Sequence, residues 1–204
     1  MTESAGSGVG TRALIINVGR KCFAENGFAA TSLNEIADEV GIRRQSLLHH
    51  FASKELLYQQ VLLEELAAWS SLVDDAVSGG HGGWPQVENV LRAAFTYFET
   101  HSELVRLIRR EALDGGPMLS SEIGQHLRPQ FKRAVAFIEG EMDAGRLRRY
   151  DASQLILTGY GAALSYISDA PFIERLLDED PLSPTALKVR REHVLLLLRN
   201  ALEP

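Results

Sequence analysis

The sequence is poor in cysteine and has no long apolar run. Cys22 is the only cysteine among 204 residues, so the chain cannot form an intramolecular disulfide or a zinc site built from several cysteines. The most apolar stretch, 155–167, is interrupted by Thr158, Gly159 and Ser165. It therefore falls short of the roughly 18 consecutive apolar residues of a membrane-spanning helix. The first ten residues are small and polar and lack the features of a signal peptide. These absences predict a soluble, cytoplasmic protein without membrane contact.

Sequence patterns of sheets and of enzymes are also missing. No series of short alternating runs occurs, whereas apolar residues recur at spacings of three, four and seven. This spacing predicts an all-α protein with about nine helices. No metal-binding, phosphate-loop or dinucleotide motif is present. Ser46 and His49 lack the nucleophile elbow, oxyanion loop and acid of a catalytic site. We therefore expect neither catalysis nor a bound metal or cofactor.

Excess positive charge is absent as well, since the formal net charge is −6. The chain is therefore not basic throughout, as a nucleic-acid coat protein would be. Residues 1–60 nevertheless contain six Lys and Arg against six Asp and Glu, so the whole deficit lies in 61–204. Between Arg43 and Lys54 there are three cations and no carboxylate. This local surplus is compatible with a small DNA-binding face.

Two very short helices are predicted near the N-terminus, over residues 33–40 and about 44–50. The first has an apolar stripe with helical spacing, formed by Leu33, Ile36, Ala37 and Val40. Ser32 and Glu35 have the spacing of a capping box before it, and Gly41 is suited to end it. Helices of this length are marginal in isolation, so they require a third helix to pack on.

The preceding helix supplies that support. Its apolar stripe includes Leu14, Val18 and Cys22, and it is predicted to end at Gly27. Three helices of which the last two are joined by a tight turn describe a helix-turn-helix, whose second short helix enters the DNA major groove. A small helical subdomain without DNA contact is the alternative interpretation.

Cations at helix starts favour DNA contact. Arg43 and Arg44 begin the second short helix and Lys54 begins the next helix, where the macrodipole disfavours a cation by roughly 0.3–1 kcal/mol. A phosphate would offset this cost. Arg44, Gln45 and Ser46 also have the hydrogen-bonding groups that read base edges. An ordinary solvated face is the alternative for the two arginines.

Residues 11–57 resemble the TetR family of bacterial transcriptional repressors. The resemblance is carried by Phe23-Ala24-Glu25-Asn26-Gly27-Phe28, Thr31-Ser32-Leu33, Ile36-Ala37, Val40-Gly41-Ile42 and His49-His50-Phe51-Ala52-Ser53-Lys54-Glu55-Leu56. It implies a helix-turn-helix DNA-binding domain followed by a helical domain for ligand binding and dimerisation. We assign a disordered tail to 1–10, the DNA-binding domain to 11–53 and the regulatory domain to 54–204.

The resemblance also implies which residues contact DNA. Base reading falls on Arg43, Arg44, Gln45 and Ser46, and phosphate contacts fall on Thr31, His49, His50 and Lys54. Three positions depart from the family pattern. Leu48 and His50 replace tyrosines, and Arg43 replaces a serine cap worth roughly 1 kcal/mol. Packing or solvent exposure without DNA contact is the alternative for the two histidines.

The C-terminal part is predicted to contain further helices. They run from Lys54 towards Val77, along the stripe 87–98 after a glycine-rich break at 79–85, from Ser102 to Gly115, over 123–145, from Asp151 and from Ser183. In the TetR family, the last two helices pair with a second subunit. The small residues Gly159 and Gly161 and the apolar run 195–198 fit such a homodimer. Packing inside the monomer is the alternative.

Candidate effector contacts are polar or aromatic residues on apolar helix faces. Glu111 lies on the inner side of its helix and needs a partner, either a protein group such as an arginine or a ligand. The other candidates are His126, Trp69, Phe95, Phe98, Phe131, Phe137 and Tyr160. Ordinary core packing is the alternative for each. An apolar or amphipathic small molecule is the expected effector.

These features predict a ligand-responsive transcription regulator. We expect a repressor that binds a palindromic operator as a homodimer and is released by its effector. The helix that begins at Lys54 and includes Trp69 would couple the two functions. A helical small-molecule carrier or adaptor without DNA binding is the alternative.

Overall fold

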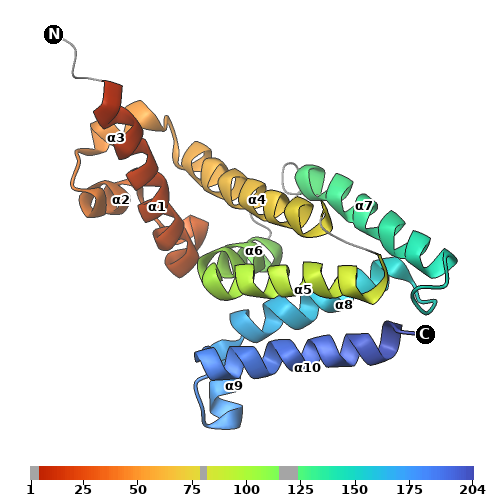
Figure 1. Ribbon diagram of the computed structural model, residues 1–204. Coiled ribbons are helices and arrows are strands. Elements are labelled where there is room, and N and C mark those ends of the chain that lie inside the picture. Colours follow the sequence, from red (N-terminus) through yellow and green to blue (C-terminus); the bar gives the residue numbers. More distant parts are fainter. Residues whose placement is uncertain (1–4, 79–81, 115–123) are drawn as a thin grey trace. The chain divides into compact units, whose positions relative to one another are not determined.

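A computed structural model describes residues 5–78, 82–114 and 124–204, and all regular structure in these ranges is helical. The ten helices are α1 (Ala5–Ala30), α2 (Leu33–Val40), α3 (Arg44–His50), α4 (Lys54–Ser78), α5 (Gly83–Thr100), α6 (Ser102–Asp114), α7 (Gly124–Asp143), α8 (Ala152–Ser168), α9 (Ala170–Leu177) and α10 (Pro184–Leu202) (Figure 1). The predicted all-α fold is confirmed.

The tenth helix, α9, is the one that we did not predict. It follows α8 after a single residue, Asp169, which ends α8 and precedes α9. Pro171 lies in its first turn, where a missing backbone N–H is tolerated. Unlike α2, which has the same length, α9 has neither a side-chain capping bond at its start nor a glycine at its end, so the sequence did not separate it from α8. The predicted ninth helix therefore corresponds to α10.

Two predicted irregular segments are partly helical. Helix α1 begins at Ala5, inside the segment for which we expected a disordered tail, and residues 1–4 lie outside the described ranges. Likewise, α5 begins at Gly83, within the predicted break at 79–85, of which 79–81 lie outside the described ranges. Pro85 fits the first turn of α5 because the first helical N–H groups have no partner in the helix.

Most predicted helix starts are confirmed by capping contacts. The side chains of Ser53, Asp151 and Ser183 each accept a hydrogen bond from the backbone N–H three residues later, at 3.2, 2.9 and 3.3 Å. At Gly27 the backbone has φ 80° and ψ 167°, which interrupts α1 where we predicted its end. Local sequence therefore determines where most of these helices begin and end.

The described chain divides into two compact units. Unit 1 comprises Met1–Ala67 with Arg106–Gly124, and unit 2 comprises Ala68–Val105 with Gln125–Pro204. Helices α4 and α6 therefore contribute residues to both units. Our predicted boundary at 53/54 coincides with the start of α4, whereas the division by contacts falls inside that helix.

Each unit has its own apolar core. In unit 1, α1 packs on α2 and α2 on α3, with Phe23, Ile36 and Leu47 fully buried. In unit 2, α5 packs against α8 and α10, and Phe95, Leu164 and α10 residues such as Leu198 are buried there.

Candidate functional site

Local contacts hold α2, α3 and the turn between them in place. Ser32 Oγ accepts a hydrogen bond from the Glu35 N–H at 3.1 Å, and Glu35 Oε2 accepts one from the Ser32 N–H at 3.5 Å, which completes the predicted capping box. Gly41 ends α2 in the left-handed conformation, with φ 78°, which glycine adopts without steric cost. Ile36 and Leu47 anchor the two helices in the core. The motif thus presents α3 in one orientation.

Helix α3 presents polar side chains on its outer surface. It spans Arg44–His50, as predicted, and the four residues 43–46 are all exposed. Arg43 precedes the helix without a side-chain capping bond, as expected where a serine is replaced. Among the described residues, the guanidinium groups of Arg43 and Arg44 have no hydrogen-bond or ion-pair partner. They are therefore available to an external anion or base edge.

Thr31 has a structural position that conflicts with the expected phosphate contact. Its side chain is only 1 % exposed, and its hydroxyl lies 3.1 Å from the Cys22 carbonyl oxygen and 2.8 Å from that of Gly27, in donor geometry. The Thr31 N–H also donates to the Gly27 carbonyl oxygen, at 3.3 Å, so both polar groups of Thr31 near this turn are directed at the end of α1. The expectation was wrong because sequence spacing did not reveal that this hydroxyl points inward.

Lys54 also differs from the expectation. Its ammonium group donates to the carbonyl oxygens of Phe28, Ala29 and Thr31 at 2.7, 3.3 and 2.9 Å, and it lies 4.4 Å from the centre of the Phe28 ring. These contacts use all three donors of the ammonium group. The side chain holds the end of α1, beyond Gly27, against the start of α4. These contacts indicate a structural role, and the phosphate contact stays a prediction.

The two histidines lie at the end of α3. His49 is exposed and His50 is half-buried, with ring centres 6.0 Å apart. Both therefore retain a solvent-facing part, which a phosphate contact requires. Leu48 is half-buried and cannot donate a hydrogen bond.

The single cysteine belongs to the core of unit 1. Cys22 is buried and its Sγ lies 3.5 Å from Oε2 of Glu39. Burial, followed by the hydrogen bond to Glu39, raises the pKa of the Cys22 thiol to about 12. The thiol is therefore protonated at neutral pH and is a poor nucleophile.

Glu111 has a protein partner. It is 2 % exposed in α6, and the Tyr58 hydroxyl of α4 donates to its Oε2 at 2.6 Å. The predicted burial and a protein partner, Tyr58, are confirmed. Arg110, the residue before Glu111, donates a hydrogen bond to the Glu25 carbonyl oxygen of α1, at 2.7 Å. The end of α6 thus joins both α4 and α1 within unit 1.

Part of the predicted aromatic set comes together in unit 2. Trp69 of α4 stacks on Phe98 of α5, with ring centres 4.7 Å apart, and Phe95 is buried one turn earlier in α5. Ser70, the next residue of α4, accepts a hydrogen bond at its Oγ from Nε2 of Gln130 in α7, at 2.7 Å. Phe131, which follows Gln130, is half-buried. Helix α4 therefore contacts α5 through Trp69 and α7 through Ser70.

Of the remaining predicted effector residues, the structure describes the side chains of Tyr160 and Phe137. Tyr160 is 41 % exposed on α8, which does not support the predicted role as a wall of an effector cavity within the single chain. The outward direction of its side chain depends on how α8 packs on α5, which the sequence alone does not define. Phe137 is half-buried in α7. The side chain of His126 lies outside the described part of the structure.

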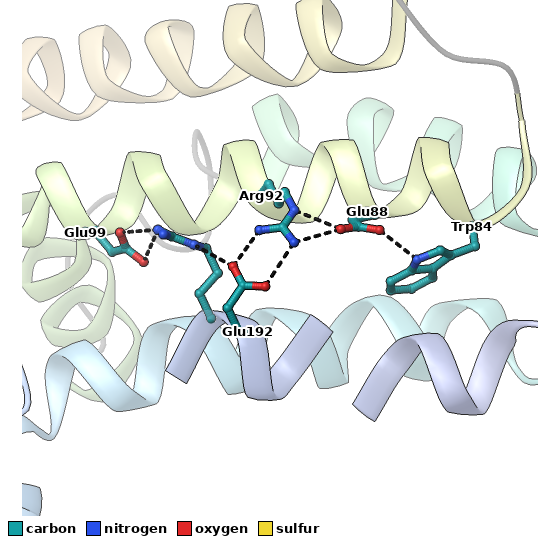
Figure 2. Close-up of polar contacts among 6 residues, drawn as sticks. Trp84, Glu88, Arg92, Glu99 and Glu192 are labelled. Atoms are coloured by element: carbon teal, nitrogen blue, oxygen red, sulfur yellow. Dashed lines mark hydrogen bonds and ion pairs between the residues drawn. The ribbon is translucent and has the colours of Figure 1, made fainter. Parts of the chain in front are cut away.

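A polar network between α5 and α10 was missed by sequence reasoning. It comprises Trp84, Glu88, Arg92, Glu99, Arg191 and Glu192 (Figure 2). Arg92 binds Glu192 through two nitrogens at 2.7 and 3.0 Å and also contacts Glu88. Arg191 contacts both carboxylate oxygens of Glu99. The contact with Arg92 lowers the pKa of Glu192. Only the four-residue spacing of Glu88 and Arg92 was a signal in the sequence.

The outward faces of α8 and α10 are apolar. Leu157 on α8 and Val189, Leu196 and Leu197 on α10 are between 49 % and 64 % exposed. Tyr160 lies on α8 three residues after Leu157. Val194, Leu195 and Leu198 of α10 are buried within the chain. Helix α10 is therefore apolar on two sides, as an interface helix is.

Membrane-spanning helices and metal sites are not found in the described ranges. None of the helices there is long and apolar enough to cross a membrane. Over the same part of the chain, no group of three or more His, Cys, Asp or Glu side chains is arranged to hold a metal ion.

Comparisons with known proteins agree with this architecture. The chain matches the family of bacterial regulatory proteins of the tetR type over residues 15–61 and a tetracyclin repressor-like C-terminal domain over residues 85–197. The HTH-type transcriptional regulator RutR of Escherichia coli K12 is 27 % identical over 182 residues, which cover 85 % of each chain.

Solved structures show the same fold. The ketosteroid transcriptional regulator KstR2 of Mycobacterium tuberculosis superposes with a TM-score of 0.71 at 24 % identity over 95 % of each chain. AibR, solved with isovaleryl coenzyme A and operator DNA, gives 0.71 at 15 % identity over 92 % of this chain and 97 % of AibR. Because the two family matches together span most of the sequence, the chain belongs to the TetR family of bacterial regulatory proteins.

Proposed function

We propose that this protein is a ligand-responsive transcriptional repressor that binds a two-fold operator as a homodimer. The observation that carries the proposal is the set of exposed polar side chains at the start of α3, for which the described part of the chain provides no partner. They stand on a short helix whose orientation is held by the capping box, by Gly41 and by buried Leu47. A rigidly held helix of this kind can enter the major groove with its N-terminal residues facing the bases.

The proposed DNA contacts follow from side-chain chemistry. Arg43 and Arg44 are suited to guanine O6 and N7, Gln45 to adenine, and Ser46 to either donor or acceptor groups. His49 and His50 are proposed to contact phosphate. Thr31 and Lys54 are left out of this set because their polar atoms are engaged inside unit 1.

The dimer is proposed to form through α8 and α10. Their exposed apolar residues would be buried against the same helices of a second copy. Such a two-fold interface matches the symmetry of a palindromic operator, whose half-sites lie about one DNA turn or a multiple of it apart. Leu196 and Leu197 lie at the centre of the proposed contact.

The effector is proposed to bind next to the Trp69 cluster. Trp69, Phe95 and Phe98 supply apolar surface from α4 and α5, and half-buried Phe131 of α7 is proposed to add to it. An apolar or amphipathic molecule is the ligand that this surface favours. AibR, of similar fold, has been solved with an acyl coenzyme A and with operator DNA, which makes a ligand of mixed character a reasonable first candidate.

Coupling between effector and operator is proposed to involve α4 and α6. Each helix contributes residues to both units. Within unit 1 they are joined by the bond between Tyr58 and Glu111, and α6 is joined to α1 through Arg110. A shift of either helix caused by effector binding would therefore act on the helices that support α3. Binding of the effector must differ between the two arrangements for this to change operator affinity.

Selection of bound DNA from a random pool tests the proposed function. The expected result is a two-fold consensus with regularly spaced half-sites. Arg44→Ala should lose affinity for the selected DNA, whereas Arg128→Ala removes the same charge from α7 in unit 2 and should retain it. Absence of any enriched sequence at moderate salt would contradict the proposal and favour a carrier or adaptor.

A further inference from the structure

Helix α9 exposes three large apolar side chains. Phe172 and Leu176 are each 65 % exposed, and Leu177 is 54 % exposed. Phe172 and Leu176 are four residues apart and therefore lie on one face of the helix. Ala170 is buried, Ile173 is half-buried and α9 packs on α8, so this side of the helix holds it in unit 2. Leu177 lies seven residues after Ala170, at the C-terminal end of the same side, and is nevertheless exposed.

Exposed apolar residues are concentrated on α8, α9 and α10. Eight of the thirteen large apolar side chains that are exposed in the described structure lie on these three helices, which have 17, 8 and 19 residues. Soluble proteins rarely leave an apolar area of this extent uncovered unless it is an interaction surface. The excess is therefore a property of this end of the chain rather than of the surface in general.

The position of α9 along the chain makes it continuous with the helices of the proposed dimer. Asp169 is both the C-cap of α8 and the N-cap of α9. Buried Pro181 and the bond from the Leu182 N–H to Asp180 Oδ1, at 2.9 Å, define the short turn that leads into α10. A second copy that covers α8 and α10 therefore reaches the segment that connects them.

We propose that α9 forms part of the interface between two copies of this chain, with Phe172, Leu176 and Leu177 buried against the partner copy. This inference depends on the proposed dimer and extends it from two helices to three. The exposed charges of Glu174 and Arg175 lie on the same short helix and would form the polar rim that surrounds such a contact.

A second copy fits α9 better than a lipid surface does. Membrane-binding amphipathic helices carry Lys and Arg on their polar face and are attracted to anionic lipids. The polar residues of α9 and the turn after it are mostly acidic, with Glu174, Asp178, Glu179 and Asp180 against Arg175. Anionic lipid would therefore repel this segment.

The dissociation constant of the full-length dimer tests the inference. We expect Leu176→Ser to raise this constant at least tenfold in sedimentation equilibrium, and Phe172→Ser with Leu176→Ser to raise it further. Far-UV circular dichroism should be unchanged because both side chains are exposed in the single chain. Leu113→Ser is the matched control, since Leu113 is 76 % exposed on α6, in a part of α6 that belongs to unit 1, and should leave the constant unchanged.

The outcomes separate this inference from the proposed function. Leu196→Ser with Leu197→Ser should dissociate the dimer whether or not α9 takes part. If these changes dissociate it while the α9 variants do not, α9 is not in the interface and the two-helix dimer stands. A wild-type chain that is monomeric at all concentrations overturns both. Loss of binding to phosphatidylglycerol vesicles in the α9 variants, with an unchanged dimer, would assign α9 to lipid and overturn the inference.

Discussion

The arginines at the start of α3 and those between α5 and α10 have opposite surroundings. Arg92 and Arg191 bind carboxylates on neighbouring helices, and their charge is used to join α10 to α5 (Figure 2). Arg43 and Arg44 have exposed side chains for which the described residues provide no partner. A paired arginine supports the fold, whereas an unpaired one in a rigid helix is available to DNA.

Lys54 shows that the position of a cation along the sequence does not reveal whether its charge is paired within the protein or exposed. It belongs to the same cationic segment as Arg43 and Arg44, with no carboxylate between them. Its ammonium group nevertheless binds three carbonyl oxygens inside unit 1. The cationic segment therefore contains one cation that is bound within the protein and two that are exposed. Substituting each in turn should distinguish their roles.

The largest expected effect is on DNA binding. Replacing Arg43 and Arg44 together with alanine should weaken operator binding by about 1–3 kcal/mol for each base that the arginines read. The free energy of unfolding should change by less than about 0.5 kcal/mol, since both side chains are exposed. Fluorescence anisotropy with the selected operator at fixed salt measures the first quantity, and urea unfolding measures the second. A large loss of stability would contradict the comparison.

Lys54→Met should have the reverse pattern. It retains the apolar stem but removes the three bonds to carbonyl groups, so we expect the free energy of unfolding to fall by about 1.5–3 kcal/mol. At temperatures where the variant is folded, the dependence of operator affinity on salt should keep its slope. If the slope instead falls by about one unit at unchanged stability, Lys54 contacts phosphate after all.

Ser32→Ala should weaken the support of α3 by a smaller amount. Loss of the capping box typically costs about 1 kcal/mol. Urea unfolding should detect this change, and Ser78→Ala, at the far end of α4, provides a control because its hydroxyl donates to a carbonyl oxygen of its own helix. Equal stability of the Ser32→Ala variant and the wild type would mean that tertiary packing alone orients α2.

The smallest effect is expected in the polar network. The folded-state pKa of Glu192 lies below its ordinary value because of Arg92. The contact with Arg92 therefore stabilises the folded protein at pH values above the ordinary pKa of a glutamate. This contribution is lost as the pH falls through the folded-state pKa of Glu192. Both side chains are more than 40 % exposed, so Arg92→Leu should cost less than about 1 kcal/mol at pH 7. Unfolding of wild type and variant at neutral and at acidic pH, below the folded-state pKa, should show this difference disappear in acid.

Short-range patterns predicted the DNA-binding motif well. The bounds of α3, the capping box before α2 and the glycine after it depend on residues near one another in the chain, and all were confirmed. Helix α9, which has the same length as α2, was missed because it follows α8 directly and lacks the capping box and the terminal glycine that delimit α2. The roles of the DNA-binding residues remain predictions, with Thr31 disfavoured by its burial and Lys54 by its contacts inside unit 1.

The sequence by itself determined the helical class, most helix ends, the polar start of α3 and the resemblance to the family. These properties follow from local backbone preferences and from residues close together along the chain. Only the tertiary structure decided the direction of the Lys54 ammonium group, the pairing of Glu111 with Tyr58, the polar network between α5 and α10 and the exposure of Tyr160. Each of these depends on side chains brought together from separate helices, and their energies are set by burial and distance that a linear pattern does not contain.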